Sequence, residues 1–497
     1  MDIAFSETAP ADVDTLVVGV LEERTPTVSA ASLDKATGGA LGRAMGAGRF
    51  TGAKDQMIEV AAASGTSAAR IVLAGLGKAT SLDDVAMANW GGAIAARLNA
   101  VGARKAAVHV DEIAGAKGHL ADHAAQVGAG ARLRGYRFDR YRTKQKPEDK
   151  PTLDRLTVVT GARATAEQVF GRLDRVVDGV VMTRDLVSEP ANILVPKEMA
   201  ERAKSLAELG VDVEILGEER MRALGMGALL GVGQGSDNES QLIVMRWNGT
   251  EDSERPVAFV GKGVCFDTGG ISIKPAAGME EMKYDMAGAG TVIGLMKALA
   301  GRKAKVNAVG ICACVENMPS GKAQRPGDVV KSMSGQTIEV INTDAEGRLI
   351  LADALWYCQS QFKPKFMVDL ATLTGAIVIA LGAYKAGLFA NDDDLAAKLL
   401  AAGLAVGEPL WRMPLGEDYD KDINSDIADM KNVGKNREAG STAGAVFLQR
   451  FVGDTKWAHL DIAGMAWAKK DLPLTPKGAS GFGVRLLDRL VRENFEG

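Results

Sequence analysis

Apolar and polar positions alternate in two distinct ways along the first third of the chain. Short apolar runs predict strands at residues 16–21, 71–76 and 106–110. Longer stretches with helical spacing predict helices at residues 32–45, 81–100 and 118–134, and one long amphipathic helix at residues 164–186. Because strands and helices alternate, the pattern indicates an α/β layer structure.

The same alternation resumes at residue 196. Apolar runs predict strands at residues 211–216, 241–247, 257–260, 306–315 and 366–369. Helical spacing predicts helices at residues 197–209, 218–224, 287–300 and 348–361. This order is typical of a mostly parallel sheet covered by helices on both faces. In such sheets the functional crevice lies beyond the carboxyl ends of the strands.

The fold class expected for the whole chain is α/β, with two domains that each contain a sheet sandwiched by helices. A length of 497 residues is enough for more than one domain and a large core. We expect an N-terminal α/β domain at residues 1–163, a linker helix at 164–187 and a C-terminal catalytic domain at 188–497.

Composition narrows the class of protein. Apolar residues make up 46% and charged residues 25%, as in ordinary globular proteins, and the net charge of −4 gives no broad basic field for nucleic acid. The N-terminus lacks the basic-then-apolar pattern of a signal peptide, and no run of 18 apolar residues predicts a membrane span. Four cysteines in so long a chain indicate reduced thiols, so we expect a cytoplasmic protein without a membrane partner.

Three local patterns favour structural roles over functional ones. The basic stretch at residues 137–150 predicts an exposed charged loop in preference to a nucleic-acid patch. The glycine-rich run at 231–236 predicts a backbone turn, because no Lys-Ser/Thr follows it and it precedes a strand. Cys312 and Cys314 share one face of a predicted strand, which suits small core residues.

The candidate chemistry lies between residues 261 and 348. This stretch holds four carboxylates, Asp267, Asp285, Asp344 and Glu346, and three cations, Lys262, Lys274 and Arg348. Gathered acids repel one another unless a counter-charge arrives, and two divalent cations would balance four carboxylates. Hard oxygen ligands suit Mg²⁺, Mn²⁺ or Zn²⁺, and paired ions suit hydrolysis. Surface charge paired with the neighbouring Lys and Arg explains the spacing equally well.

Two further observations restrict the chemistry. Asp344 and Glu346 are two residues apart, so in an extended segment their side chains would share a face. The sequence contains neither HExxH nor GxSxG, and His459 is the only histidine after residue 188. A hydrolytic site would therefore depend on carboxylates and metal. The polar stretch at residues 425–442 predicts a loop near that site or at an intersubunit contact.

Three motifs together resemble the leucine aminopeptidase (cytosol aminopeptidase) family. They are GKGVCFDTGGISIK at residues 261–274, MKYDM at 282–286 and NTDAEGRL at 342–349. The last is very specific, and the similarity covers the C-terminal two-thirds of the chain. Ser188 and Ala191 depart from the family's usual junction sequence, which we interpret as a structural difference. The resemblance implies a two-metal exopeptidase that releases N-terminal residues from peptides.

The resemblance also implies a role for each site residue. One metal would be held by Lys262, Asp267, Asp285 and Glu346, and the other by Asp267, Asp344 and Glu346. The ions would be Mn²⁺ or Zn²⁺ and would activate the attacking water. Lys274 would polarise the scissile carbonyl, and Arg348 would hold a bicarbonate ion that acts as general base.

Substrate recognition and assembly follow from the same resemblance. Pocket positions match Met282, Thr372, Gly375 and Ala463, which predicts a preference for Leu and other apolar residues at a free N-terminus. Relatives assemble as hexamers, so a homohexamer is expected. Two alternatives stay open: a two-metal phosphoesterase, which would need a clamp of Arg or Lys, and a secondary DNA-binding role.

Overall fold

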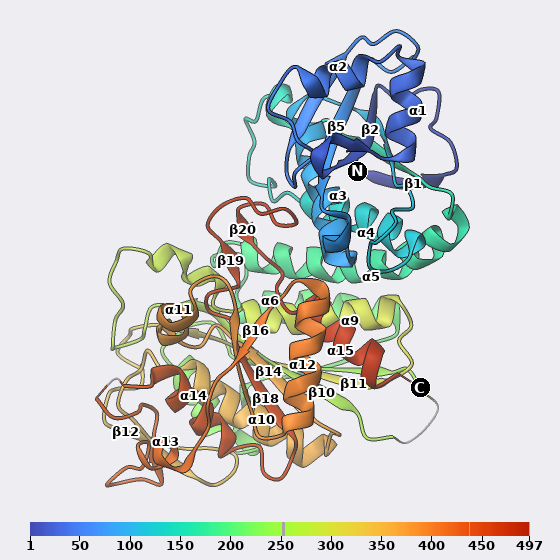
Figure 1. Cartoon of the computed structure of the whole chain (residues 1–497). Helices are drawn as coiled ribbons and strands as arrows, with labels where there is room; N and C mark the ends of the chain where they lie inside the picture. Colours follow the sequence, from blue (N-terminus) through green and yellow to red (C-terminus); the bar gives the residue numbers. More distant parts are fainter. Residues whose placement is uncertain (251–253, 437, 497) are drawn as a thin grey trace. The chain divides into compact units, whose positions relative to one another are not determined.

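The computed structural model describes residues 1–250, 254–436 and 438–496 and divides the chain into two compact units (Figure 1). The first unit contains Met1–Val177 and Lys470–Pro476, and the second contains Asp178–Lys469 and Lys477–Gly497. Both are α/β structures, which confirms the fold class predicted from the alternation of apolar runs and helical patterns.

The first unit is built on a seven-stranded sheet in the order β1-β7-β6-β2-β5-β4, with β3 paired to β2. The strands are β1 (Asp2–Ser6), β2 (Thr15–Leu21), β3 (Thr25–Pro26), β4 (Met57–Ala61), β5 (Arg70–Gly77), β6 (Lys105–His109) and β7 (Arg155–Val159). The three predicted strands are β2, β5 and β6. The sequence missed β1 and β4, which are mostly half-exposed and lie at the two edges of the sheet. It also missed the short β3 and the mostly buried β7.

The helices of this unit correct two predicted bounds. They are α1 (Val28–Ala36), α2 (Ala40–Gly46), α3 (Asp84–Ala100), α4 (Leu120–Arg134) and the first half of α5 (Arg163–Ser188). A single helix at residues 32–45 was wrong, because Gly38 and Gly39 take φ angles of +62° and +79° and separate α1 from α2. The predicted helix at 81–100 begins later, where the Asp83 side chain accepts a hydrogen bond from the N–H of Ala86.

The second unit is built on an eight-stranded sheet in the order β16-β15-β18-β14-β10-β11-β9-β8. Its strands are β8 (Asp212–Leu216), β9 (Gln241–Asn248), β10 (Val257–Asp267), β11 (Asn307–Asn317), β14 (Met367–Ala371), β15 (Ala386–Ala390), β16 (Leu410–Arg412) and β18 (Trp457–Asp461). The four central strands β18, β14, β10 and β11 are parallel, while β15 and β9 pair antiparallel at their flanks. Their carboxyl ends therefore meet at one edge.

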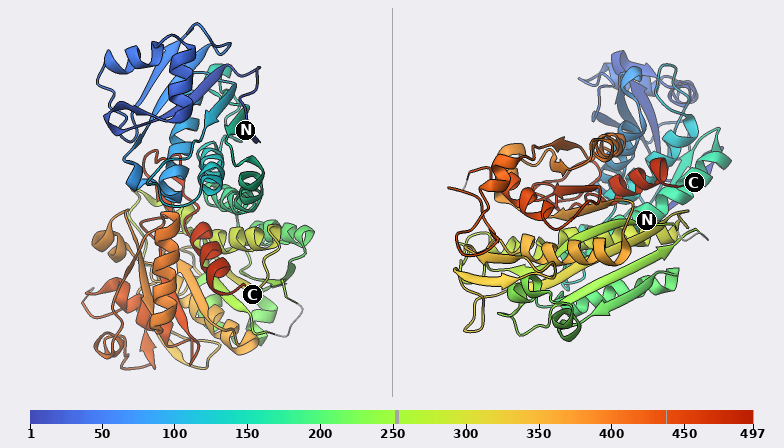
Figure 2. Two further views of the ribbon diagram at one scale, coloured as in Figure 1. Left: turned by 45° about the vertical axis from the view of Figure 1, so that its right-hand side comes forward. Right: turned by 90° about the horizontal axis from the view of Figure 1, so that it is seen from below.

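Helices cover both faces of this sheet and enclose one apolar core on each side (Figures 1 and 2). One face carries α6 (Pro196–Lys204), α9 (Ala287–Gly301), α12 (Asp393–Val406) and α15 (Val484–Asn494). The other carries α7 (Glu218–Ala223), α8 (Gly227–Gly233), α10 (Gly347–Phe362) and α14 (Gly440–Gln449). With helices above and below, the loops at the sheet edge are the natural place for a site.

Smaller elements complete this unit. They are the sheet of β12 (Asp328–Lys331), β13 (Thr337–Val340) and β17 (Met430–Lys431), the pair β19 (Trp467–Ala468) and β20 (Gly478–Ala479), and the helices η4 (Ser205–Leu209), η5 (Met279–Tyr284), α11 (Gly375–Leu381) and α13 (Glu417–Lys421). The predicted helix at residues 197–209 is α6 followed by η4. The glycine-rich run at 231–236 is not wholly a turn, because its first three residues end α8.

Two sequence interpretations concern the core and the membrane. Cys312 and Cys314 are fully buried in β11 and unpaired, and burial raises the pKa of both thiols, so both are core residues as predicted. Among the residues that the structure describes, no helix has the length and apolar character needed to cross a membrane.

Candidate metal centre and active site

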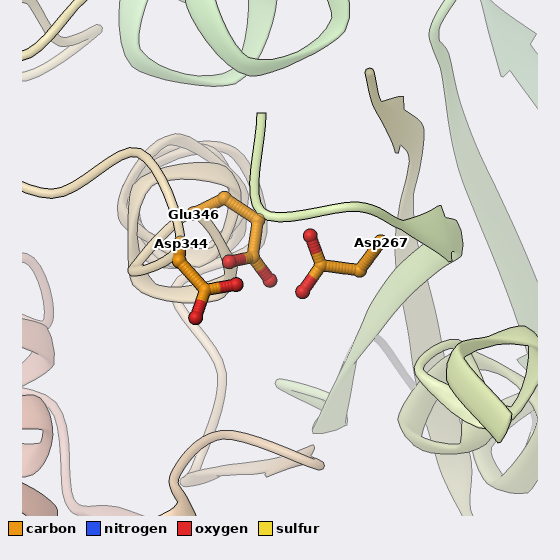
Figure 3. Close-up of side chains that lie close together, drawn as sticks. All are labelled: Asp267, Asp344 and Glu346. Carbon is orange, nitrogen blue, oxygen red and sulfur yellow. The ribbon is translucent and has the colours of Figure 1, made fainter. Parts of the chain in front are cut away.

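Three carboxylates meet at the carboxyl edge of the second unit's sheet (Figure 3). Asp267 is the last residue of β10, while Asp344 and Glu346 lie in the turn that leads into α10. One ligand oxygen from each lies within 4.8 Å of the others. The segment 344–346 is not extended as the spacing argument assumed: the N–H of Ala345 donates to the Asn342 carbonyl at 3.1 Å and closes a turn. The two side chains nevertheless approach the same point.

Lys262 connects this cluster to Asp285. Its Nζ lies 2.8 Å from Asp285 Oδ2 and 2.8 Å from Glu346 Oε1, and donates to the Thr372 carbonyl at 2.9 Å. The side chain is only 3% exposed. It passes so close to Gly347 that a Cβ there would lie 2.7 Å from Lys262 Cε. A side chain at residue 347 would therefore push Lys262 away from Asp285 and Glu346, which explains why glycine, a residue of poor helix propensity, begins α10.

Lys274 lies on the other side of the carboxylates. Its Nζ is 2.7 Å from Asp267 Oδ2 and also pairs with Asp344 Oδ1. The loop after β10 folds back to deliver this lysine: the N–H of Lys274 donates to the Thr268 carbonyl at 2.9 Å, and Gly269 takes a φ of +85°. The two lysines therefore contact all four predicted acids.

Burial and mutual repulsion raise the pKa of three of these acids. Burial is the main cause for Glu346, Asp285 and Asp344, and the negative charge of Asp267 adds to it, while the lysines act in the opposite direction. Burial disfavours the ammonium form of Lys262 and of Lys274, but the surrounding carboxylates prevail and hold the pKa of each lysine above its ordinary value. The two lysines therefore do not balance the negative charge of the four carboxylates.

The donor set fits divalent metal ions. Asp285 Oδ2, Asp344 Oδ1 and Glu346 Oε1 are buried and receive no hydrogen bond of acceptable geometry from the described residues, although each lies close to a lysine ammonium. Buried carboxylate oxygens without hydrogen bonds are costly unless a cation is present. Four carboxylates and two ammonium groups leave two negative charges uncompensated, and the ligands are the hard oxygens that Mn²⁺, Mg²⁺ and Zn²⁺ accept.

Arg348 lies on the first turn of α10, behind Glu346. It is 7% exposed, and its Nη1 donates to the Asn432 carbonyl at 2.8 Å. Its buried Nε has no hydrogen-bond partner in the described part of the chain. Burial lowers the pKa of Arg348 to about 10, although the negative charges of Glu346 and Asp461 act to raise it. Asn432 belongs to the polar stretch 425–442, so that stretch does reach the site.

A cavity of about 380 Å³ opens beside the acids. Ten of the eleven predicted site residues line it, all except Arg348: Lys262, Asp267, Lys274, Met282, Asp285, Asp344, Glu346, Thr372, Gly375 and Ala463. Leu373, Val378 and Met279 add apolar surface. Thr372 also supports a predicted ligand, because its Oγ1 donates to Asp285 Oδ1 at 2.6 Å.

The sequence reasoning missed several polar residues behind the acids. Asn317 and Thr343 bond to the Asp267 loop, and Asp461 accepts hydrogen bonds from the Leu373 N–H and the Thr374 hydroxyl. His459 pairs with Asp369 at 2.6 Å inside the sheet and is no ligand of this cavity. Asn317 and Asp461 end β11 and β18, so the strand-end rule applied to every strand could have found them.

Comparison with known proteins agrees with this geometry. The catalytic domain of the cytosol aminopeptidase family matches residues 181–488, and the N-terminal domain of the same family matches residues 17–145. A probable cytosol aminopeptidase of Caulobacter vibrioides is 57% identical over 470 residues, which cover 94% of each chain. A probable cytosol aminopeptidase of Rhizobium etli is 53% identical over 499 residues, covering 100% of this chain and 99% of the relative.

Two solved structures share the whole fold. A tomato leucine aminopeptidase mutant superposes with a TM-score of 0.87 at 35% identity, covering 99% of this chain and 97% of that one. The bottromycin maturation enzyme BotP in complex with Mn gives 0.84 at 31% identity, covering 97% and 99%. Both family domains match this chain, and the catalytic domain contains a cavity lined by carboxylates that could hold a metal ion. The chain therefore belongs to the cytosol aminopeptidase family and is a metal-dependent hydrolase of peptide N-termini.

Proposed function

We propose that this aminopeptidase uses a two-metal centre held by Asp267, Asp285, Asp344, Glu346 and, once the ions have displaced its proton, Lys262. The observation that carries the proposal is the convergence of Asp267, Asp344 and Glu346 within 4.8 Å, with Asp285 joined to them through Lys262. A Mn-bound relative of the same fold supports manganese as one of the ions, with zinc as the alternative.

Bound divalent ions would supply Lewis acidity and lower the pKa of a water molecule towards neutrality. The surrounding residues would stabilise the developing charge and hold the group that accepts a proton. Lys274 would present its ammonium to the negative charge that develops on the scissile carbonyl oxygen, where a fixed cation is most effective. Its position between Asp267 and Asp344 holds that ammonium at the edge of the cavity.

Arg348 would hold an anion that accepts a proton during the reaction, and bicarbonate has the right planar shape. The unused Nε–H of this buried guanidinium supports the proposal, because an arginine binds a planar anion through two parallel N–H groups. The apolar wall formed by Met282, Ala463 and Val378 favours Leu and similar side chains at the substrate's N-terminus.

Assembly, location and boundaries belong to the same proposal. We expect a homohexamer acting in the cytoplasm, as the names of the relatives suggest for location. The division into residues 1–163, 164–187 and 188–497 stays a prediction. Light scattering of the purified protein tests the six-chain assembly, and a mass of one chain would contradict it.

Substrate assays and metal analysis test the central proposal. Protein purified without added metal should contain close to two divalent ions per chain, and should cleave leucine p-nitroanilide but not its N-acetylated form. Glu346→Ala and Asp267→Ala should lose the ions. A protein that cleaves the substrate with no bound metal, or a Glu346→Ala variant with full metal content, would refute the ligand assignment.

A further inference from the structure

The loop that carries Asp267 and the turn that carries Asp344 are joined through one buried side chain, Asn317. It is the last residue of β11 and pairs in register with Asp267, the last residue of β10. Asn317 is 2% exposed. Its Nδ2 donates to Asp267 Oδ1 at 2.8 Å and to the Thr343 carbonyl at 3.0 Å. One amide group thus connects two segments that lie far apart in the sequence.

The chemistry of the neighbours fixes the orientation of this amide. Asp267 Oδ1 and the Thr343 carbonyl can only accept hydrogen bonds, so the group facing them must be the nitrogen. The backbone holds the side chain in place: the Asn317 carbonyl accepts from the N–H and from the Oγ1 of Thr268, at 3.0 and 2.8 Å. On the far side, a Cβ at Gly270 would come within 2.7 Å of Asn317 Oδ1.

The hydrogen bond from Asn317 gives the two oxygens of Asp267 different partners. Oδ1 accepts from Asn317 and also from the N–H of Gly269 at 2.8 Å. Oδ2 receives neither of these donors and points to Lys274, on the cavity side. A carboxylate with one oxygen held by two donors cannot rotate, so the remaining oxygen faces the cavity in a fixed direction.

We propose that Asn317 is a positioning residue of the metal centre. It orients Asp267 so that Oδ2 is the oxygen offered to the ions, and it sets the distance between Asp267 and the Asp344 turn through the Thr343 carbonyl. This proposal rests on the ligand set given under the proposed function. It adds that ion affinity depends on a side chain that itself contacts no ion and no substrate.

The decisive variant is Asn317→Leu, which keeps much of the shape and removes the donor without adding a charge. It removes the hydrogen bonds to Asp267 Oδ1 and to the Thr343 carbonyl. Mn²⁺ should bind the metal-free variant about 10–100-fold more weakly than the wild type, the usual effect of losing a hydrogen bond to a ligand. Titration calorimetry with Mn²⁺ measures this without reference to activity. The Mn²⁺ concentration for half-maximal turnover should rise by the same factor.

Asn391→Leu is a matched control in the same unit. Asn391 also joins two segments, donating to the Thr455 carbonyl at 3.0 Å and accepting from the Trp457 N–H at 2.7 Å, but at the amino end of β18. Its variant should keep Mn²⁺ affinity within about twofold. If Asn317→Leu does not fold, Asn317→Ser tests the same contact with a smaller neutral side chain, with an expected loss of about tenfold.

The outcomes separate this inference from the proposed function. Wild-type protein that binds no Mn²⁺ would overturn the ligand set itself. Wild-type protein that binds Mn²⁺ while a folded Asn317 variant binds it equally well would overturn only the positioning role. An equal loss of affinity in Asn391→Leu would show that Asn317 only stabilises the sheet in general and would also overturn the proposal.

Discussion

Replacing Lys274 with methionine should separate catalysis from metal binding. The side chain is 20% exposed and its Nζ contacts Asp267 Oδ2 and Asp344 Oδ1, two oxygens that we assign to the ions. Methionine retains much of the hydrocarbon volume and removes the charge. If Lys274 stabilises the developing oxyanion, kcat should fall by about 10²–10³, which corresponds to about 2.7–4 kcal/mol. KM should change little, because the substrate's side-chain pocket is untouched.

Metal affinity should move in the opposite direction. In the metal-free protein Lys274 competes for ligand oxygens, and its removal leaves the acids with one more uncompensated negative charge. Two unit charges 4 Å apart interact by about 4 kcal/mol at an effective dielectric constant of about 20, so the change favours a divalent cation. Mn²⁺ should therefore bind Lys274→Met at least as tightly as it binds the wild type.

The assay is hydrolysis of leucine p-nitroanilide at saturating Mn²⁺, combined with calorimetric titration of Mn²⁺. Lys398→Met is the control, because Lys398 pairs with Asp394 on α12 and lies away from the cavity. If kcat stays within threefold of the wild-type value while metal is bound, Lys274 only balances the charge of the carboxylates and does not stabilise the oxyanion. A marked loss of Mn²⁺ affinity would instead make the lysine a structural support of the ligands.

Three further perturbations test other parts of the site and fold. Glu346→Ala removes an oxygen ligand of the cluster and should reduce turnover to background with loss of metal by elemental analysis; a normal rate with retained metal contradicts the assignment. Chelation should abolish activity, and added Mn²⁺ should restore it; activity that survives complete metal removal refutes metal dependence. Burial raises the pKa of Asp353 to about 7, so the folded state binds its proton more tightly than the unfolded state does, and the free energy of unfolding should decrease as pH rises from about 4 to about 7, by about 1.4 kcal/mol per pKa unit. Urea unfolding of the metal-free proteins measures the free energy of unfolding at pH 5 and at pH 8. The difference between the two pH values should be smaller for Asp353→Asn than for the wild type, and equal differences would exclude Asp353 as the cause.

The sequence predicted most strongly what depends on local pattern. The buried strands β2, β5, β11 and β14 and the first four residues of β10 follow from apolar runs, and α9 and α10 follow from helical spacing. The edge strands β1 and β4 could not be found this way, because each has a weak pattern that becomes a strand only through its partner. The break between α1 and α2 needed the left-handed backbone of Gly38 and Gly39, which the helical spacing of the surrounding residues concealed.

The candidate metal ligands could be identified from the sequence because each of them lies within a recognisable motif. What motifs do not give is the set of contacts between segments. Asn317 lies 50 residues after Asp267 and outside the three motifs, and its place at the end of a predicted strand is the one signal that the sequence offers for it. Only the parallel pairing of β10 with β11 places it against Asp267.

The order of strands in the sheet explains why such a site can form at all. β10 lies between β11 and β14, so the residues that end these three strands converge although the chain visits them at positions 267, 317 and 371. The loop after β14 returns the Thr372 carbonyl to Lys262 and its hydroxyl to Asp285, and the end of β11 holds Asp267 from the other side. Asp267 is thus held in part by the end of β11, and Asp285 and Lys262 are held by the loop after β14. For that reason, substitutions that alter the ends of β11 or β14 should affect metal binding even when every acidic residue is retained.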